Sequence, residues 1–160
     1  MSLSRAYSPH EHKPLGGYAA LTLLFNLAIA AFAVAQQRSG RKLPERIPPT
    51  DVLLMSAATH KLSRLIAKDR VTSFARAPFT RYVGESSASE VSEEPRGEGL
   101  QRAIGELLGC PYCLGQWVAA GLLATYLRRP RSARTVAALF AIGGGADFLQ
   151  QAWSAVEKTA

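Results

Sequence analysis

An uncharged apolar stretch near the start of the chain places the tightest constraint on the fold. Residues 16–35 read GGYAALTLLFNLAIAAFAVA and carry no charge. A helix of about 20 residues is about 30 Å long, which matches the hydrocarbon core of a bilayer. We therefore expect a transmembrane helix over residues 16–37, after a polar tail at residues 1–15.

A cleaved signal peptide is the alternative interpretation of this stretch. Ala33, Val34 and Ala35 resemble an A-x-A cleavage site. However, the apolar run is longer than the usual signal-peptide core of about 7–15 residues. The basic stretch that follows, QQRSGRKLPER, opposes translocation of that end. The sequence therefore favours a retained helix, followed by a basic loop at residues 38–50.

The apolar residues are segregated rather than spread along the chain. They make up 48% of the residues and are concentrated in three stretches. After the first stretch, we expect a C-x-x-C turn and transmembrane helix at residues 110–129, and another transmembrane helix at residues 135–154. An Arg-rich turn at residues 130–134 joins these two helices, and a tail at residues 155–160 follows.

The basic residues point to lipid head groups rather than to nucleic acid. The net charge is +7, and the basic residues cluster beside the apolar stretches. Anionic head groups favour this placement, whereas no alternation of aromatic and basic residues suggests base stacking. We expect no nucleic-acid partner.

Residues 51–70 form an amphipathic helix with a basic face. Such a helix lies flat on the membrane surface, or it crosses the bilayer with its basic face packed against protein. We also expect a polar, partly disordered loop at residues 71–99 and a short amphipathic helix at residues 100–109. The predicted fold is an all-α integral membrane protein with three to four membrane segments plus the short amphipathic helix.

Cys110 and Cys113 form the motif CPYC at the start of an expected helix. A helix N-terminus lowers the pKa of a thiol, which suits redox catalysis. Structural zinc needs four ligands, and His10, His12 and His60 are remote in sequence. A structural pair or a local disulfide at the joint between two helices is favoured over redox catalysis and over metal binding. We expect no cofactor and no metal.

Small residues recur at helical spacing in the last two apolar stretches. Small residues on one stripe let membrane helices approach closely. The predicted packing positions between helices 110–129 and 135–154 are Ala120, Ala124, Ala137, Ala141 and Gly145.

Asp147 lies inside an apolar stretch, where an unpaired carboxylate is costly. If helix 51–70 crosses the bilayer, Asp147 lies roughly 18 Å from the basic end, with Lys61 at roughly 16 Å and Arg64 at roughly 21 Å. We predict that Asp147 pairs with Arg64, with Lys61 or His60 as a second contact. A proton or ion path is the alternative, for which a single acid is thin evidence.

The orientation follows from the basic loops. The turn RRPRSAR and the loop QQRSGRK both favour the cytoplasm, and both can lie there only if helix 51–70 crosses. Cys110 and Cys113 then lie outside, where a local disulfide is expected. With three membrane segments, the cysteines instead face the cytoplasm.

Three stretches together resemble a known family. KLSRLIAKDRVTSFARAPF, CPYCLGQWV and ADFLQ resemble small uncharacterised bacterial membrane proteins, a domain of unknown function with a C-x-x-C-x-G-x-W-V motif. The resemblance covers roughly residues 50–153. It implies a bacterial origin and a membrane setting, and it implies no activity.

The sequence favours a non-enzymatic scaffold or accessory subunit, placed as a multi-pass protein in the cell membrane. Its expected partners are the lipid bilayer and other membrane proteins or a second copy of itself. A membrane thiol–disulfide protein that uses Cys110 and Cys113 is the alternative.

Overall fold

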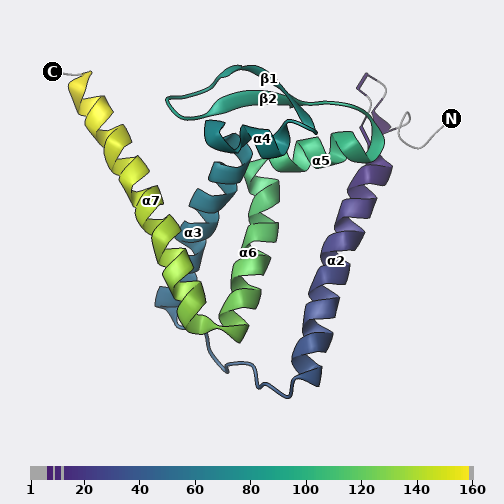
Figure 1. Ribbon diagram of the computed structural model, residues 1–160, viewed down its shortest axis with the longest axis vertical. Coiled ribbons are helices and arrows are strands. Elements are labelled where there is room, and N and C mark those ends of the chain that lie inside the picture. Colours follow the sequence, from purple (N-terminus) through teal and green to yellow (C-terminus); the bar gives the residue numbers. More distant parts are fainter. Residues whose placement is uncertain (1–6, 9, 12, 159–160) are drawn as a thin grey trace.

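Four long helices run alongside one another in the computed structural model, and a shorter helix and a β-hairpin cover one end (Figure 1). The structure describes residues 7–158 except 9 and 12, so the predicted terminal tails fall partly outside it. The elements are α2 (Leu15–Arg38), α3 (Pro49–Lys68), η1 (Arg70–Thr72), α4 (Ser73–Arg76), β1 (Thr80–Glu85), β2 (Val91–Pro95), α5 (Gly99–Gly109), α6 (Pro111–Arg128) and α7 (Pro130–Glu157). The expectation of a mostly helical chain is confirmed.

Helix α3 is the centre of the bundle. It packs against both α6 and α7, and each of these contacts is more extensive than the one between α6 and α7. Ala58 of α3 and Ala137 of α7 are completely buried and form a core cluster with Leu122 of α6. Two alanines at this contact bring the helix backbones close together.

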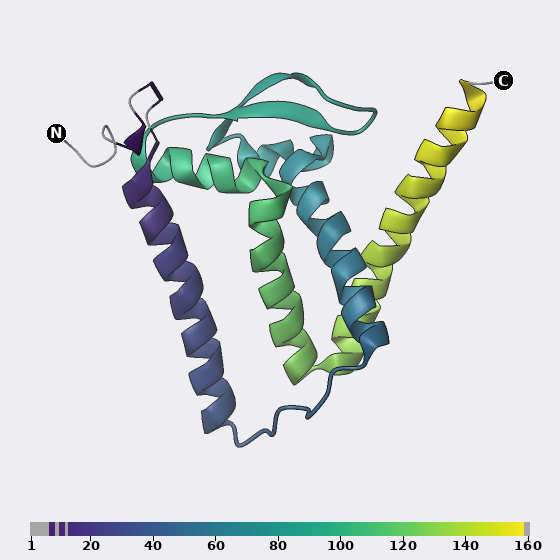
Figure 2. The same cartoon turned by 180° about the vertical axis from the view of Figure 1, so that it is seen from behind.

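Helix α2 stands apart from the other three long helices and meets α5 at the covered end (Figure 2). A Cβ atom added at Gly17 would lie 2.6 Å from the Cβ of Ala103, so this contact requires a glycine. Further along α2, Phe25 makes an edge-to-face contact with Trp117 of α6 at 5.1 Å between ring centroids. Most of the apolar surface of α2 therefore has no protein against it.

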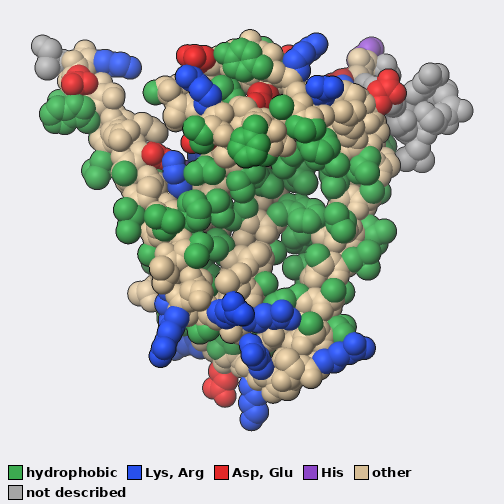
Figure 3. Space-filling view, viewed as in Figure 1, with side chains coloured by type: hydrophobic (Ala, Val, Ile, Leu, Met, Phe, Trp, Pro, Cys, Tyr) green, Lys and Arg blue, Asp and Glu red, His purple; other side chains and the backbone are tan. Residues whose placement is uncertain are grey.

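Charges are divided between the two ends of the molecule. Figure 3 shows apolar side chains across the middle of the drawn face, basic side chains at one end, and mixed charges at the covered end. At the basic end, Arg134 pairs with Asp51 at 2.6 Å. Among the described residues, the other basic side chains of this end form no ion pair: Arg38, Arg41, Lys42, Arg46, Arg128, Arg129 and Arg131.

By length and apolar composition, α2 alone among the described helices could cross a membrane, and none of its apolar window is buried. Helices α5 and α6 would add a second crossing if their 82° bend were a break within one span. Charges along α3, and Asp147 with two glutamines in α7, lower the hydropathy of those helices. Composition alone thus supports fewer membrane segments than the three to four expected.

The covered end contains a β-hairpin, so the all-α prediction is wrong there and the loop expected at residues 71–99 is largely folded. Strands β1 and β2 pair antiparallel, with Thr80 opposite Pro95 and a bulge between Tyr82 and Gly84. The Ser- and Glu-rich composition of this segment suggested a solvated linker. Cross-strand pairing and ion pairs stabilise it instead, and local composition does not reveal them.

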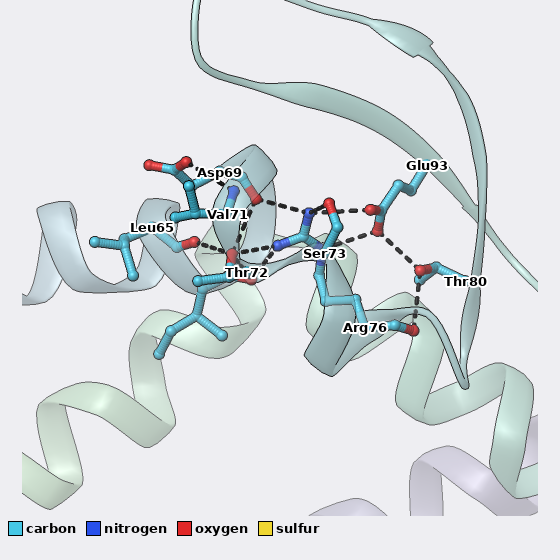
Figure 4. A network of polar contacts seen from close by, with 9 residues as sticks. Leu65, Asp69, Val71, Thr72, Ser73, Arg76, Thr80 and Glu93 are labelled. Carbon is cyan, nitrogen blue, oxygen red and sulfur yellow. Dashed lines mark hydrogen bonds and ion pairs between the residues drawn. The ribbon is translucent and has the colours of Figure 1, made fainter.

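A buried arginine joins the hairpin to the end of α3 (Figure 4). The side chain of Arg76 is fully buried and donates to both carboxylate oxygens of Glu93, at 2.8 and 3.0 Å. It also donates to the backbone carbonyls of Ile66 and Asp69 at 2.6 and 3.0 Å. Because both charges are paired and hydrogen-bonded, the protein can hold them out of water.

The carboxyl of Glu93 is held ionised by these contacts. Burial alone would raise its pKa, but hydrogen bonds from Arg76 and Thr80 and the charge of Arg76 lower it below the ordinary value of 4.5. A carboxyl with a lowered folded-state pKa stabilises the protein above its unfolded pKa. That stability is lost as the pH falls through the folded-state value.

We predict that Glu93→Gln destabilises the hairpin by about 3–5 kcal/mol at neutral pH, because it leaves Arg76 buried without its counter-charge. The substitution should also remove the carboxyl-dependent loss of hairpin stability below pH 4.5. Hydrogen exchange of the strand amides, corrected for the intrinsic effect of pH, measures both effects.

The matched control is Glu94→Gln, since Glu94 is 57% exposed and pairs with the exposed Arg81. It should change stability by less than about 1 kcal/mol. Equal effects of the two substitutions would contradict the role of Arg76 and Glu93.

Candidate functional site

A polar hollow of about 690 Å³ lies between α3, α7 and the turn of the hairpin. Charged, hydroxyl and amide groups dominate its lining. Its lining includes His60, Lys61, Arg64, Glu90, Gly144, Asp147 and Phe148. It is about twice the volume of a second hollow, of about 340 Å³, beside Phe32 and Arg128.

Lys61 of α3 and Asp147 of α7 form an ion pair in the lining of this hollow. The Nζ atom of Lys61 lies 2.6 Å from Oδ2 of Asp147, and the two side chains are 20% and 48% exposed. Gly144 makes this approach possible, because an added Cβ there would lie 3.3 Å from the Cβ of Lys61. The structure therefore joins Asp147 to the residue expected as its second contact.

Arg64 has a different partner from the one predicted. It donates from Nε and Nη2 to the carboxylate of Glu90, at 3.0, 2.7 and 2.6 Å. The predicted pairing of Arg64 with Asp147 is wrong because the hairpin, which was not expected, carries Glu90 to the end of α3. His60 stacks on Phe148 at 6.0 Å between ring centroids, so its contact is with a ring of α7.

The small-residue positions differ in what they contact. Ala137 is completely buried against α3 and α6. Ala120, Ala124 and Ala141 are partly buried. Gly145 is exposed, and an added Cβ there would meet nothing within 4 Å. The close approach of α7 occurs at Gly144, one residue earlier, and it is to α3 rather than to α6.

The two cysteines lie at the joint between α5 and α6. Cys110 is the residue before α6, and its Sγ accepts a hydrogen bond from the backbone N–H of Cys113 at 3.2 Å. Both are free thiols, so the expected local disulfide is not formed in this structure, and Cys113 is exposed. No three His, Cys, Asp or Glu side chains come together as metal ligands among the described residues, which include His10 and His60 but not His12.

A second charged cluster lies at the basic end. Both carboxylate oxygens of Asp51 accept hydrogen bonds from Arg134, at 2.9 and 2.6 Å, and Tyr126 donates to Oδ2 at 2.7 Å. The sequence analysis did not single out Asp51 as a member of a charged cluster. The available signal was a carboxylate in the first turn of α3 and an arginine at the end of the Arg-rich turn, but the pairing spans 83 residues.

Comparison with known proteins places the chain in a family. A family described as protein of unknown function DUF1360 matches residues 54–153, which include the hollow's ion pairs and both cysteines. The chain belongs to the DUF1360 family.

Two relatives from Bacillus subtilis (strain 168) resemble this DUF1360 protein. "Sporulation protein YjcA" is 31% identical over 102 residues, which cover 62% of this chain and 86% of the relative. "UPF0713 protein YngL" is 28% identical over 111 residues, which cover 68% of this chain and 82% of the relative. No solved structure matches. The expected resemblance to an uncharacterised bacterial family is confirmed.

We predict that Lys61 and Asp147 are energetically coupled, whereas Arg64 and Asp147 are not. In a double-mutant cycle, Lys61→Leu and Asp147→Leu should show a coupling energy of about 0.5–3 kcal/mol, because each single substitution leaves one charge without its partner. The free energy of unfolding of the four proteins measures it.

The control cycle combines Arg64→Leu with Asp147→Leu and should be additive within about 0.5 kcal/mol. If Arg64 were coupled to Asp147 and Lys61 were not, the contacts described for the hollow would be wrong.

Proposed function

We propose that this protein is a multi-pass membrane protein in which α2, α3, α6 and α7 cross the bilayer. In this proposal the basic end faces the cytoplasm. The observation that carries the proposal is the exposed apolar belt between a basic end and a charged, covered end (Figure 3).

The exposed apolar side chains are large and lie on more than one helix. They include Leu23, Leu24 and Leu27 on α2, and Leu139 and Ile142 on α7. Soluble proteins seldom expose contiguous apolar patches of this kind, whereas lipid tails cover them without cost. The belt therefore supports membrane crossings by helices other than α2, the one helix that length and composition identify among the described residues.

Three of the four charged side chains of α3 have partners, and the fourth, Lys68, lies in the last turn at the covered end, so the helix is compatible with a crossing. Lys61 pairs with Asp147, Arg64 pairs with Glu90, and Asp51 pairs with Arg134. Charged residues within membrane helices face other protein groups and pair with them. The pairing favours a crossing of α3 over a flat position on the membrane surface.

The positions of the basic loops support the orientation. The loop after α2 and the turn between α6 and α7 lie at the same end (Figure 1), and Arg41 donates to the backbone carbonyl of Arg128 at 3.5 Å. Short loops rich in Lys and Arg remain in the cytoplasm. The hairpin, α5 and the cysteines would then lie outside.

A non-enzymatic scaffold or accessory subunit is the role that we propose for this membrane protein. Helix α7 leans away from the bundle toward its C-terminal end (Figure 1). Exposed apolar side chains follow one side of it at spacings of three, four and seven residues: Leu139, Ile142, Leu149 and Trp153. This spacing suits contact with another membrane helix, from a different membrane protein or from a second copy.

A membrane thiol–disulfide protein is the second candidate. The hydrogen bond from the N–H of Cys113 to Sγ of Cys110 favours it, because it holds the two cysteines together at the start of α6. Cys110 is partly exposed, so it could attack the disulfide of a partner protein, and Cys113 could then resolve the mixed disulfide and leave the partner reduced.

We predict that Ser87→Cys, in the turn of the hairpin, reacts with a membrane-impermeant maleimide in intact cells. The background for this test is Cys110→Ala with Cys113→Ala. The protein should remain with the membranes after alkaline extraction. Labelling only after lysis would overturn the orientation, and release by alkali would overturn the membrane setting. Ser39→Cys, at the basic end, is the control that should react only after lysis.

We predict that Cys113→Ala traps no mixed disulfide through Cys110. Cells quenched with acid and alkylator, and then analysed on non-reducing gels, provide the measurement. Accumulation of a mixed disulfide that disappears in the Cys110→Ala, Cys113→Ala protein would contradict the scaffold role and establish thiol–disulfide exchange.

A further inference from the structure

We propose that the groove between α2 and α6 at the basic end binds one anionic phospholipid, with its phosphate on Arg128 and Arg129 and an acyl chain between the two helices. This site lies on the opposite side of the bundle from the polar hollow. The proposal rests on the membrane setting proposed above.

The groove contains a hollow of about 340 Å³ whose lining combines cationic and apolar side chains. Phe32 and Ala124 contribute the apolar part, and Thr125, Arg128 and Arg129 complete the lining. A guanidinium group presents several N–H donors to a phosphate at once, which makes arginine well suited to this ligand. Two arginines beside an apolar wall match a head group joined to an acyl chain.

The arginines of this groove have no acidic partner in the described part of the chain, although such partners are common elsewhere in the molecule. The guanidinium of Arg128 lies over the ring of Phe32, 5.0 Å from its centroid, and this contact holds it at the groove. Arg41 adds a further cation by donating to the carbonyl of Arg128. The carboxylate of Asp51, at the same end, is already occupied by Arg134 and Tyr126.

A buried, unpaired amide lies one helical turn beyond Phe32 on α2, toward the basic end. Gln36 is 4% exposed, and neither atom of its side-chain amide has a hydrogen-bond partner among the described residues. It follows Phe32 by four residues, about one helical turn, and so lies on the same side of α2. An unpaired buried amide is costly, so in this proposal a small shift of the Gln36 side chain lets its N–H donate to the lipid phosphate.

The arrangement of α2 and α6 favours a lipid over free phosphate. Farther from the basic end, toward the covered end, α2 and α6 meet through Phe25 and Trp117. The contact between α2 and α6 is less extensive than that of α2 with α5. An acyl chain that continues from the head group would lie along this seam toward Trp117. Free phosphate would leave the apolar side of the groove uncovered.

Quenching of Trp117 by brominated lipids tests the proposal in the full chain. The chain has two tryptophans, so Trp153→Phe leaves Trp117 as the reporter. In reconstituted vesicles, brominated phosphatidylglycerol should quench Trp117 with an apparent association constant about 30-fold higher than that of brominated phosphatidylcholine, the scale expected for two arginines at an anionic head group.

Two pairs of substitutions locate the effect. Arg128→Gln with Arg129→Gln should reduce the preference for phosphatidylglycerol at least fivefold, toward equal binding. Arg46→Gln with Arg131→Gln removes the same charge from exposed positions of the same end and should leave the preference unchanged. Gln36→Leu should weaken the preference while the quenching by phosphatidylcholine stays the same.

Four outcomes would overturn the proposal. Equal quenching by both lipids would exclude the site while leaving the membrane setting intact, and absence of quenching by either lipid would contradict both. If both substitution pairs reduced the preference for phosphatidylglycerol equally, the basic end would attract anionic lipids without a specific site. Displacement of phosphatidylglycerol by inorganic phosphate at matched ionic strength would identify a free-phosphate site instead.

Discussion

The pairing of the charged side chains of α3 is the constraint on which the rest of the structure depends. An amphipathic helix with a basic face can lie at the centre of a bundle only if the charges along its middle have partners, whereas Lys68 in its last turn lies at the covered end. Asp51 pairs with an arginine of α7, Lys61 pairs with Asp147 farther along α7, and Arg64 pairs with the hairpin. These contacts fix α7 along the length of α3 and bring the hairpin over the end of the bundle.

The hairpin and the bundle depend on each other through the same kind of interaction. Arg76 and Glu93 attach the hairpin to the last turn of α3, and Arg64 and Glu90 hold its turn above the polar hollow. The Arg76 pair is buried, so breaking it should be far more costly than breaking the exposed pairs of the strands. The turn of the hairpin therefore forms part of the wall of the polar hollow, together with α3 and α7.

Local periodicity predicted the helices well, because an apolar face repeats within each segment and needs no knowledge of the partner. The distance of each residue from the basic end, obtained from the rise per residue of a helix, also placed Asp147 near the level of Lys61. This distance could not decide whether Lys61 or Arg64 pairs with Asp147. Arg64 pairs with Glu90 instead, because strand pairing that composition did not reveal brings Glu90 to it. Likewise, Gly144 rather than Gly145 faces α3, because a rotation of one residue about a helix is decided by tertiary packing.

The central claim is that α3 crosses the bilayer with its charges paired, rather than lying flat on the surface. Spin labels at Leu53 and Ala57, one turn apart on the exposed side of α3, test it through their accessibility to oxygen and to a water-soluble nickel complex. A crossing helix predicts a higher ratio of oxygen to nickel accessibility at Ala57 than at Leu53, because one turn adds about 5–6 Å of depth. Equal ratios at the two positions would place both at one depth and would contradict the account.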